Sequence, residues 1–575
     1  TRCIHCTRCV RFSQEIEGLQ ELGTIGRGEN MQISMYIEKA VDHELSANII
    51  DLCPVGALNN KPYRYSARAW EMVQRPAVSP HDCVGSNMYA HVLRGTVKRV
   101  VPRENEEINE TWISDRDRFS YQGIYSDERL TRPLMKVNGE WQSVDWQAAL
   151  EKLANVLSAA DGDKVGILSA PTATLEESHL LARIAAKLGS DNLDHRLQQR
   201  DFSDQENDPL MPGLGCNIAD LETRDAILVV GSNLRREAPI LAHRVRKAAM
   251  AGARVAFVNN GRYEYNFPVA EYLDTTSLVA ELAGVAVALS AGRSLPESVR
   301  ELCKGVSATA GQEQVATLLR DAAAAHVLLG NVAGHHPAFA ALRALSSAIA
   351  TLADAGFGRL SDGPNSAGAS LAGVLPHRKQ GGEARSPGGL NVAEMLDADL
   401  DALLLLGVEP DKDLADSDSL AKIAAQNFVA ALTCYDTPAL RQSVDLMLPI
   451  GSFAESAGTF VNCEGRWQSF AGMANPVAEA RPAWKVLRVL GNLLNVDDFD
   501  YESSEDVLTD IGNSVAESPP AAQYSGNSVL PGVNGTDKAQ AELDLPMYAT
   551  DSLVRRATAL QLTAEARRNG GGNAA

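Results

Sequence analysis

The chain has 575 residues, of which 45% are apolar and only 5% aromatic, and it carries a formal net charge of −20. This length exceeds one hydrophobic core and predicts roughly two to four domains, while the acidic charge excludes nucleic-acid binding and direct docking on anionic lipid. No run of eighteen apolar residues occurs, so no membrane insertion is expected. Nine cysteines in this length indicate a reducing compartment rather than a disulfide framework.

The first feature along the chain is a bunched set of cysteines. Cys3, Cys6 and Cys9 recur at a spacing of three. Cys53 lies far downstream, directly before Pro54. Three thiolates from one tight loop, closed by a remote Cys-Pro, are the ligand pattern of a cubane iron–sulfur cluster. We therefore predict one [4Fe–4S] cluster whose iron is bound by these four cysteines, and electron transfer as the function.

A structural zinc site is the alternative reading of four cysteines. Zinc ligands usually come as two separated pairs, whereas here three are bunched and one stands alone. In ferredoxins with two clusters a fourth cysteine follows three residues after the third. That region holds Ser13 instead, so Cys53 is expected to complete a single cubane, and His5 inside the loop is read as a loop residue.

The next segments change from mixed to β structure. Residues 33–45 predict a strand that passes into a helix. Two short runs, 88–94 and 96–102, flank Gly95 and predict a β-hairpin with its turn at that glycine.

From about residue 140, apolar strands alternate with amphipathic helices. The strands are continuous apolar runs, as is typical of parallel strands buried on both faces. The predicted strands are 164–169, 226–231, 253–258, 325–330, 401–407, 428–433 and 445–449, and the predicted helices are 146–160, 176–188, 238–250, 337–353 and 418–428. Repeated units of this kind predict an α/β protein with a doubly wound parallel sheet, in more than one lobe.

Two stretches have compositions typical of irregular structure. Residues 361–390 are rich in Gly, Ser and Pro and predict a long loop. Residues 513–575 predict a mobile C-terminal extension. Other chemistry-bearing residues carry little signal: Glu455 and Glu464 are read as structural, and the adjacent His335 and His336 are not read as a metal pair.

The first 58 residues closely resemble the family of large iron–sulfur subunits of NADH-quinone oxidoreductase (respiratory complex I). The matching strings are C-I-H-C-T-R-C-V-R-F (3–12), L-G-T-I-G-R-G (22–28), Y-I-E-K (36–39) and L-S-A-N-I-I-D-L-C-P-V-G-A-L (45–58). Weaker resemblance continues at 84–87, 108–119, 230–239 and 458–468. The remainder resembles the molybdopterin oxidoreductase fold.

This resemblance implies four segments. They are a [4Fe–4S] domain (1–72), a β-rich segment like a degenerate cluster domain of molybdenum and tungsten enzymes (73–135), a molybdopterin-oxidoreductase-like α/β body (136–512) and the C-terminal extension. In the family, a [2Fe–2S] cluster and a [4Fe–4S] cluster with one His and three Cys ligands precede this cubane. Because the chain lacks an initiator Met and places a ligand at its third residue, we expect those clusters in a missing N-terminal part.

The resemblance also implies partners and a location. The expected partners are other peripheral-arm subunits: the flavin-bearing, NADH-oxidising subunit, the small [2Fe–2S] subunit and the quinone-proximal iron–sulfur subunits. The expected location is the cytoplasmic side of the bacterial inner membrane, held by these partners. The implied role is relay of electrons toward quinone, with no catalytic residue in this chain. The rivals are a molybdenum- or tungsten-dependent catalytic subunit like formate dehydrogenase, and an assembly module with a structural cluster.

One departure from the cofactor-bearing relatives matters. Those proteins begin this region with a further [4Fe–4S] cluster bound by four cysteines, whereas here Asp82, Cys83, Ser86 and Ser114 stand at or near the expected ligand positions. Oxygen donors replace thiolates poorly on an iron–sulfur cluster. We therefore predict that this second cluster is absent, and that molybdopterin is absent too.

Overall fold

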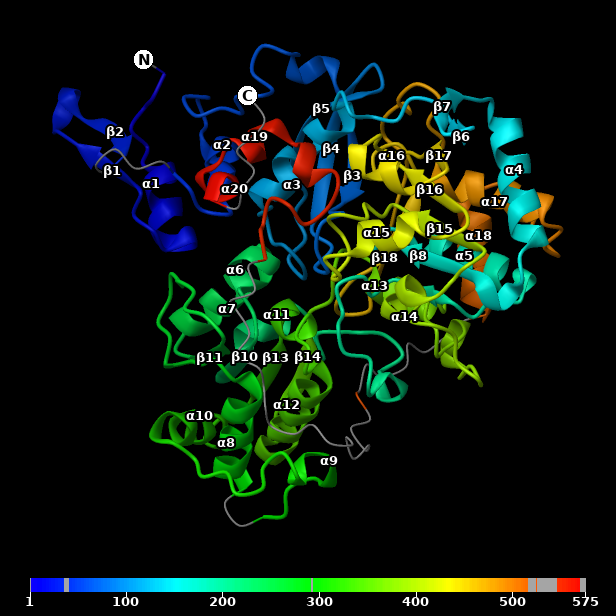
Figure 1. Cartoon of the computed structure of the whole chain (residues 1–575). Coiled ribbons are helices and arrows are strands. Elements are labelled where there is room, and N and C mark those ends of the chain that lie inside the picture. Colours follow the sequence, from blue (N-terminus) through cyan, green and yellow to red (C-terminus); the bar gives the residue numbers. More distant parts are fainter. Residues whose placement is uncertain (1, 36–40, 291–292, 515–523, 525–544, 569–575) are drawn as a thin grey trace.

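The computed structural model describes residues 2–35, 41–290, 293–514, 524 and 545–568 (Figure 1). Its N-terminal domain is small and built from short elements. They are α1 (Arg8–Phe12), the π-helix η1 (Ser13–Glu17), η2 (Gly28–Asn30), η3 (Ser46–Asn48), α2 (Ile49–Leu52) and the antiparallel pair β1 (Leu22–Ile25) and β2 (Gln32–Met35). The strand predicted at 33–45 is found as β2. Residues 36–40 lie outside the described part of the chain, and 41–45 form no helix, so that prediction is wrong there.

A three-stranded antiparallel sheet follows. It contains β3 (Val73–Val78), β4 (Asn87–Leu93) and β5 (Thr96–Pro102). Arg94 and Gly95 form the turn between β4 and β5 with φ angles of 51° and 79°, which confirms the predicted hairpin. The sheet leads to α3 (Asp115–Phe119) and the 3₁₀ helix η5 (Ser120–Tyr125).

The α/β body contains two sheets, one parallel throughout and one mostly parallel. The first has the order β12-β11-β10-β13-β14 and is parallel throughout. Its strands are β10 (Ala226–Val230), β11 (Arg254–Asn259), β12 (Glu271–Asp274), β13 (Ala325–Leu329) and β14 (Gly356–Arg359), and its helices include α6 (Leu234–Glu237), α7 (Pro239–Met250), α8 (Leu278–Ser290), α9 (Glu297–Arg300), α10 (Ala310–Arg320), α11 (Asn331–Gly334) and α12 (Phe339–Ala353).

The second sheet has the order β7-β6-β17-β16-β15-β8-β9, with β6 and β7 antiparallel at one edge. Its strands are β6 (Leu134–Val137), β7 (Glu140–Ser143), β8 (Val165–Ser169), β9 (Leu193–Asp194), β15 (Ala402–Leu406), β16 (Val429–Thr433) and β17 (Leu446–Pro449). The helices include α4 (Trp146–Ala159), α5 (Leu175–Leu188), α13 (Ser366–Leu371), α14 (Val392–Asp397), α15 (Ser419–Ala424), α16 (Pro438–Ser443), α17 (Ala483–Leu493) and α18 (Ser504–Ser514). A separate hairpin pairs β18 (Gly458–Val461) with β19 (Trp467–Phe470).

Strand residues alternate between two cores in each sheet, as the period of two requires. In β15, Leu404 and Leu406 face the core shared with α4, α5 and α17, whereas Leu403 and Leu405 face the core shared with α14. In β10, Leu228 packs toward α8 and α12. Helices therefore cover both faces of both sheets, and the predicted doubly wound α/β class is confirmed.

Two predictions of irregular structure need correction. Within 361–390, residues 366–371 form the buried helix α13, which packs against α5. Within 513–575, residues 545–568 are ordered. We call these residues the C-terminal strap; they contain η10 (Val554–Arg556), α19 (Thr558–Gln561) and α20 (Ala564–Arg568) and lie beside α3 (Figure 1). A small apolar core and several ion pairs hold the strap. Residues 515–523, 525–544 and 569–575 lie outside the described part.

Each helix in the described part of the chain falls short of the length or the apolar character that a membrane crossing requires.

Candidate functional site

The cysteine loop has an unusual backbone. His5 and Thr7 adopt left-handed conformations, with φ angles of 53° and 59°. Such a conformation costs a residue with a Cβ about 1–2 kcal/mol, and strained residues of this kind concentrate at functional sites. Alternation of left- and right-handed residues turns successive N–H groups toward one side and makes a concavity for anions. In this loop the N–H of His5 donates to Cys3 Sγ at 3.4 Å.

The fourth cysteine has the same kind of surroundings. The N–H groups of Ala57 and Leu58 donate to Cys53 Sγ at 3.2 and 3.5 Å. Burial alone would raise the pKa of the Cys53 thiol, but backbone N–H groups of residues 55–58 outweigh it and hold this pKa below its usual value. Amide donors directed at sulfur stabilise the thiolate, which is the form that binds iron.

The first three thiols influence one another electrostatically. Burial raises the pKa of the Cys9 thiol, and charge on Cys6 and Cys3 would raise it further. Cys9 lies within α1, which packs against α2, and Cys53 directly follows α2.

In the described residues, no three or more His, Cys, Asp or Glu side chains are grouped as ready metal ligands. The structure thus brings the two cysteine-bearing elements side by side, and the four-ligand set stays a prediction. The sulfur-directed amides at Cys3 and Cys53 are surroundings of the kind that stabilise a cluster-bound thiolate.

The cysteine loop is anchored to the rest of the molecule through buried contacts. Phe12 at the end of α1 packs on Trp112 with ring centroids 5.0 Å apart. Asp115 accepts from Ser46 Oγ at 2.6 Å and from the N–H of Ala47 at 2.8 Å, just ahead of α2. These contacts hold α1 and α2 in a fixed relation to the β-rich segment.

His43 lies at the junction with the five-stranded lobe. Its Nδ1 accepts from the N–H of Leu45 at 3.1 Å, and its Nε2 lies 3.0 Å from Asn266 Nδ2. Burial lowers the pKa of His43 to about 4. The unfolded imidazole, with a pKa near 6.5, binds its proton first as the pH falls, so stability is lost between about pH 6.5 and pH 4.

We therefore expect a His43→Gln variant to lose less stability on acidification than the parent chain. The expected difference is about 1.2 kcal/mol between pH 7 and pH 5.5. Thermal midpoints of both chains at the two pH values measure it. Equal losses in parent and variant would show that His43 does not carry this dependence.

The β-rich segment contains the positions of the second cluster. Asp82 accepts from Arg116 Nη2 at 2.5 Å, and Ser114 caps α3 by accepting from the N–H of Asp117 at 3.0 Å. Ser86 is fully buried. Three of the four positions thus present oxygen, and two of these oxygens are engaged within the protein. This donor set does not fit a cubane.

Cys83, the remaining thiol of this region, lies next to Cys463. The N–H of Cys463 donates to the carbonyl of Cys83 at 2.7 Å, and both side chains are buried. Sequence reasoning missed this neighbour, because 380 positions separate the two cysteines and no local motif joins them.

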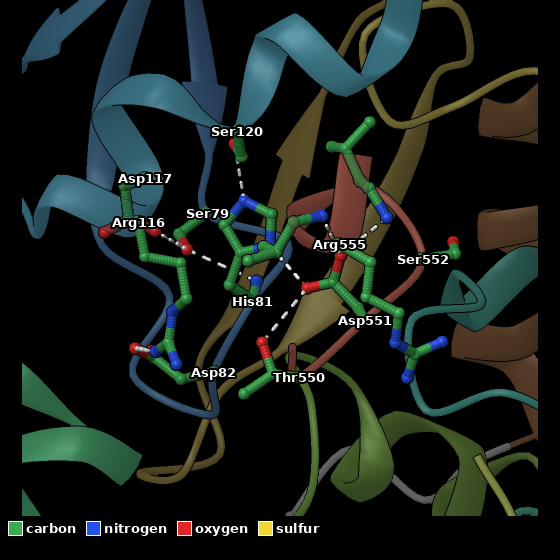
Figure 2. Close-up of polar contacts among 12 residues, drawn as sticks. Ser79, His81, Asp82, Arg116, Asp117, Ser120, Thr550, Asp551, Ser552 and Arg555 are labelled. Carbon is green, nitrogen blue, oxygen red and sulfur yellow. Dashed lines mark hydrogen bonds and ion pairs between the residues drawn. The ribbon is translucent and has the colours of Figure 1, made fainter. Parts of the chain in front are cut away.

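A buried hydrogen-bond chain stands beside this region. His81 Nε2 lies 2.7 Å from Ser120 Oγ, and His81 Nδ1 lies 2.7 Å from Asp551 of the C-terminal strap (Figure 2). This order of groups resembles a Ser-His-Asp triad. Ser120 is fully buried, however, and no substrate can reach its oxygen. The chain therefore joins three segments rather than supplying a nucleophile.

A cavity of about 410 Å³ lies at the carboxyl ends of strands from both parallel sheets. Its walls include Pro171 after β8, Asn331 after β13, Asp362 after β14 and Gly407 after β15. Folds of this class bind ligands at the carboxyl ends of their strands. Residues of the C-terminal strap form another part of the wall.

Comparison with known proteins identifies the fold. The model of the family "Molybdopterin oxidoreductase" matches residues 129–493, more than half of the chain. The chain belongs to the molybdopterin oxidoreductase family. The solved structure of acetylene hydratase from Pelobacter acetylenicus is similar in fold, with a TM-score of 0.57 and 13% sequence identity. The superposition covers 77% of this chain and 73% of the acetylene hydratase chain. At that identity the likeness concerns the fold alone.

Two further family models match the N-terminal part of the chain. "NADH-quinone oxidoreductase subunit 3, ferredoxin-like domain" matches residues 1–59, and "NADH-ubiquinone oxidoreductase NDSU1/NuoG-like, 4Fe-4S domain" matches residues 75–122. The second match covers the segment in which Asp82, Ser86 and Ser114 replace cysteine.

Similar proteins include a subunit of the NADH-quinone oxidoreductase of Rickettsia felis, 37% identical over 49% of this chain and 42% of the relative. The NADH-ubiquinone oxidoreductase 75 kDa subunit of Reclinomonas americana is 29% identical over 88% of this chain and 70% of the relative. The mitochondrial NADH-ubiquinone oxidoreductase 78 kDa subunit of Candida albicans is 32% identical over 86% of this chain and 62% of the relative. These matches confirm the resemblance on which the sequence analysis depends, although the chain spans only about two fifths of the Rickettsia felis and Rickettsia bellii relatives.

Proposed function

We propose that the chain is an electron-transferring iron–sulfur subunit of a proton-pumping NADH:quinone oxidoreductase. One [4Fe–4S] cluster bound by Cys3, Cys6, Cys9 and Cys53 would accept electrons that originate at the flavin of the NADH-oxidising subunit and pass them toward quinone. The observation that carries this proposal is the cysteine loop. Its left-handed residues and sulfur-directed N–H groups surround thiols in the order and spacing of cubane ligands.

The chain's own residues would fix and tune this cluster. Amide donors to Cys3 and Cys53 lower the electron density on sulfur, and the anchoring of α1 and α2 sets the position of the cluster. The bound cluster supplies one-electron redox chemistry. The large α/β body then serves as scaffold and interface surface, because fold and chemistry are separable.

The finer parts of the proposal concern cofactors and partners. We infer one cluster in these 575 residues, since Asp82, Ser86 and Ser114 do not suit a second, and no molybdopterin in the α/β body. A [2Fe–2S] and a His/Cys₃-ligated [4Fe–4S] cluster would belong to sequence ahead of Thr1. The partners would be the flavin-bearing, small [2Fe–2S] and quinone-proximal iron–sulfur subunits, on the cytoplasmic side of a bacterial inner membrane.

The relay role is tested in the assembled complex. We expect NADH to reduce the cubane, and a quinone to reoxidise it after dithionite reduction, both on the time scale of turnover. Rapid-freeze EPR at low temperature follows the cluster in each half-reaction. A cubane that NADH leaves oxidised, or that quinone leaves reduced, would assign the cluster a structural role instead. Metal analysis of the same sample distinguishes this relay from a molybdenum- or tungsten-dependent catalytic subunit, which requires close to one Mo or W per chain.

A further inference from the structure

The C-terminal strap lies where an α/β fold of this kind binds its ligand. Strap residues Ala549, Asp551 and Arg555 line the 410 Å³ cavity together with the loops that follow β8, β13, β14 and β15. Parallel sheets offer their ligand site at this edge, because the loops there diverge and leave a crevice. The strap therefore occupies part of the crevice itself and not a distant surface.

Two consecutive arginines hold the strap in place. Arg555 pairs with Glu409 at 2.8 Å and also with Asp413, and Arg556 pairs with Glu409 at 2.7 Å and with Glu128 at 2.6 Å. The side chain of Glu409 is only 4% exposed. Without the strap, buried carboxylates after β15 would lose their cationic partners, which is costly inside a protein.

A second set of contacts fixes the two ends of the strap. Asp551 binds His81 at 2.7 Å, and Glu565 binds Arg236 at 2.9 Å, so the strap joins the β-rich segment to the five-stranded lobe. At Gly123 an added Cβ would lie 2.2 Å from the carbonyl oxygen of Leu553. The backbone of the strap thus approaches η5 as closely as a glycine allows.

An apolar face completes the attachment. Buried strap residues form a small core of their own, into which Phe119 of α3 packs; they are Met547, Tyr548, Val554, Ala557, Leu560 and Ala566. The strap is therefore held on two sides, by ion pairs toward the crevice and by apolar contacts toward α3. This combination is expected of a resident segment rather than of a surface tail.

We propose that the C-terminal strap is a built-in plug, which fills the mouth of the crevice and excludes a dinucleotide-sized cofactor from it. The proposal stands independently of the iron–sulfur cluster. The reactivity of two cavity-lining thiols measures whether the strap covers the crevice. Cys83 lines the 410 Å³ cavity, and Cys434 lines an adjoining cavity of about 100 Å³ that Asp551, Ser552 and Leu553 of the strap also line.

The test releases the strap and measures the reactivity of these thiols with N-ethylmaleimide, mapped by peptide mass spectrometry. In an Arg555→Ala/Arg556→Ala variant of the full chain, we expect Cys83 and Cys434 to react on the order of a hundredfold faster than in the parent, as loss of buried ion-pair partners implies. The matched control is Arg441→Ala, which removes an exposed pair with Asp436. Parent-like rates at both thiols in the double variant would overturn the proposal.

The reactivity of Cys303 distinguishes release of the strap from unfolding of the chain. Cys303 is buried in the core of the five-stranded lobe and does not line either cavity. If the reactivity of Cys303 rises in the double variant as well, the reactivity of the three thiols is measured in the parent chain at increasing concentrations of urea. We expect Cys83 and Cys434 to become reactive at lower urea than Cys303. Coincident transitions of the three thiols would show that the strap is an inseparable part of the folded core, and not a separate segment that closes the crevice, and would refute the plug.

Discussion

A Cys53→Ser variant is expected to lose the cubane and the electron transfer that depends on it. Serine keeps the size of the side chain but offers a hard oxygen donor, which holds iron–sulfur clusters poorly. The N–H groups of Ala57 and Leu58 would then face a neutral hydroxyl instead of a thiolate. Iron content after anaerobic reconstitution should fall to a small fraction of the parent value, and the low-temperature EPR signal of the reduced cluster should disappear.

Cys303→Ser is the matched control for this variant. Cys303 is buried in the core of the five-stranded lobe, far in sequence from the cysteine loop. Its replacement should leave iron content and the EPR signal unchanged. Parent-like iron in the Cys53→Ser variant, or equal losses in both variants, would remove Cys53 from the ligand set.

The second large effect concerns stability. Arg129 Nη2 binds both oxygens of Glu455, at 3.2 and 3.0 Å, and the two side chains are 2% and 0% exposed. Glu455 also accepts from the N–H groups of Ser452 and Val477. An Arg129→Met variant leaves this carboxylate buried without its cation, and we expect a loss of about 3–5 kcal/mol in the free energy of unfolding.

Denaturant unfolding of parent and variant measures this loss. Arg441→Met provides the comparison, because its pair with Asp436 is solvent-exposed and should contribute less than about 1 kcal/mol. A loss from Arg129→Met no greater than that from Arg441→Met would contradict the importance of the buried pair. The same contact agrees with the interpretation of Glu455 as a structural residue.

The elements that could be predicted from the sequence are those with strong local patterns. β8, β10, β13 and β15 are predominantly apolar runs, and each is fully buried among parallel strands. α4 begins at Trp146 as predicted, after Asp145, whose side chain caps the helix by accepting from the N–H of Ala148. Such signals lie within a few residues, so neighbouring sequence is enough to identify them.

The elements that could not be predicted depend on distant partners. α13 has the sequence S-A-G-A-S-L, which has little helix propensity, and burial against α5 stabilises it. Arg555 of the strap pairs with Glu409, which is 146 residues away in the sequence, and Asp551 binds His81, which is 470 residues away. Composition alone therefore described the strap as mobile, although long-range ion pairs and a small core hold it.

The candidate site shows the same division. The spacing of Cys3, Cys6, Cys9 and Cys53 predicts the ligands, because cluster chemistry imposes that spacing. The left-handed backbone at Thr7 carries no signal in residue type, and histidine, although more frequent than most residues in this conformation, gives only a weak one at His5. Only the folded chain reveals that the amide groups are directed at sulfur.

The most direct measurement of the central claim is the iron and acid-labile sulfide content of the anaerobically reconstituted 575-residue chain, together with its EPR spectrum at low temperature. The account predicts four irons and four sulfides per chain, with a signal that develops on dithionite reduction. A colourless chain, or one that retains only zinc, would contradict it.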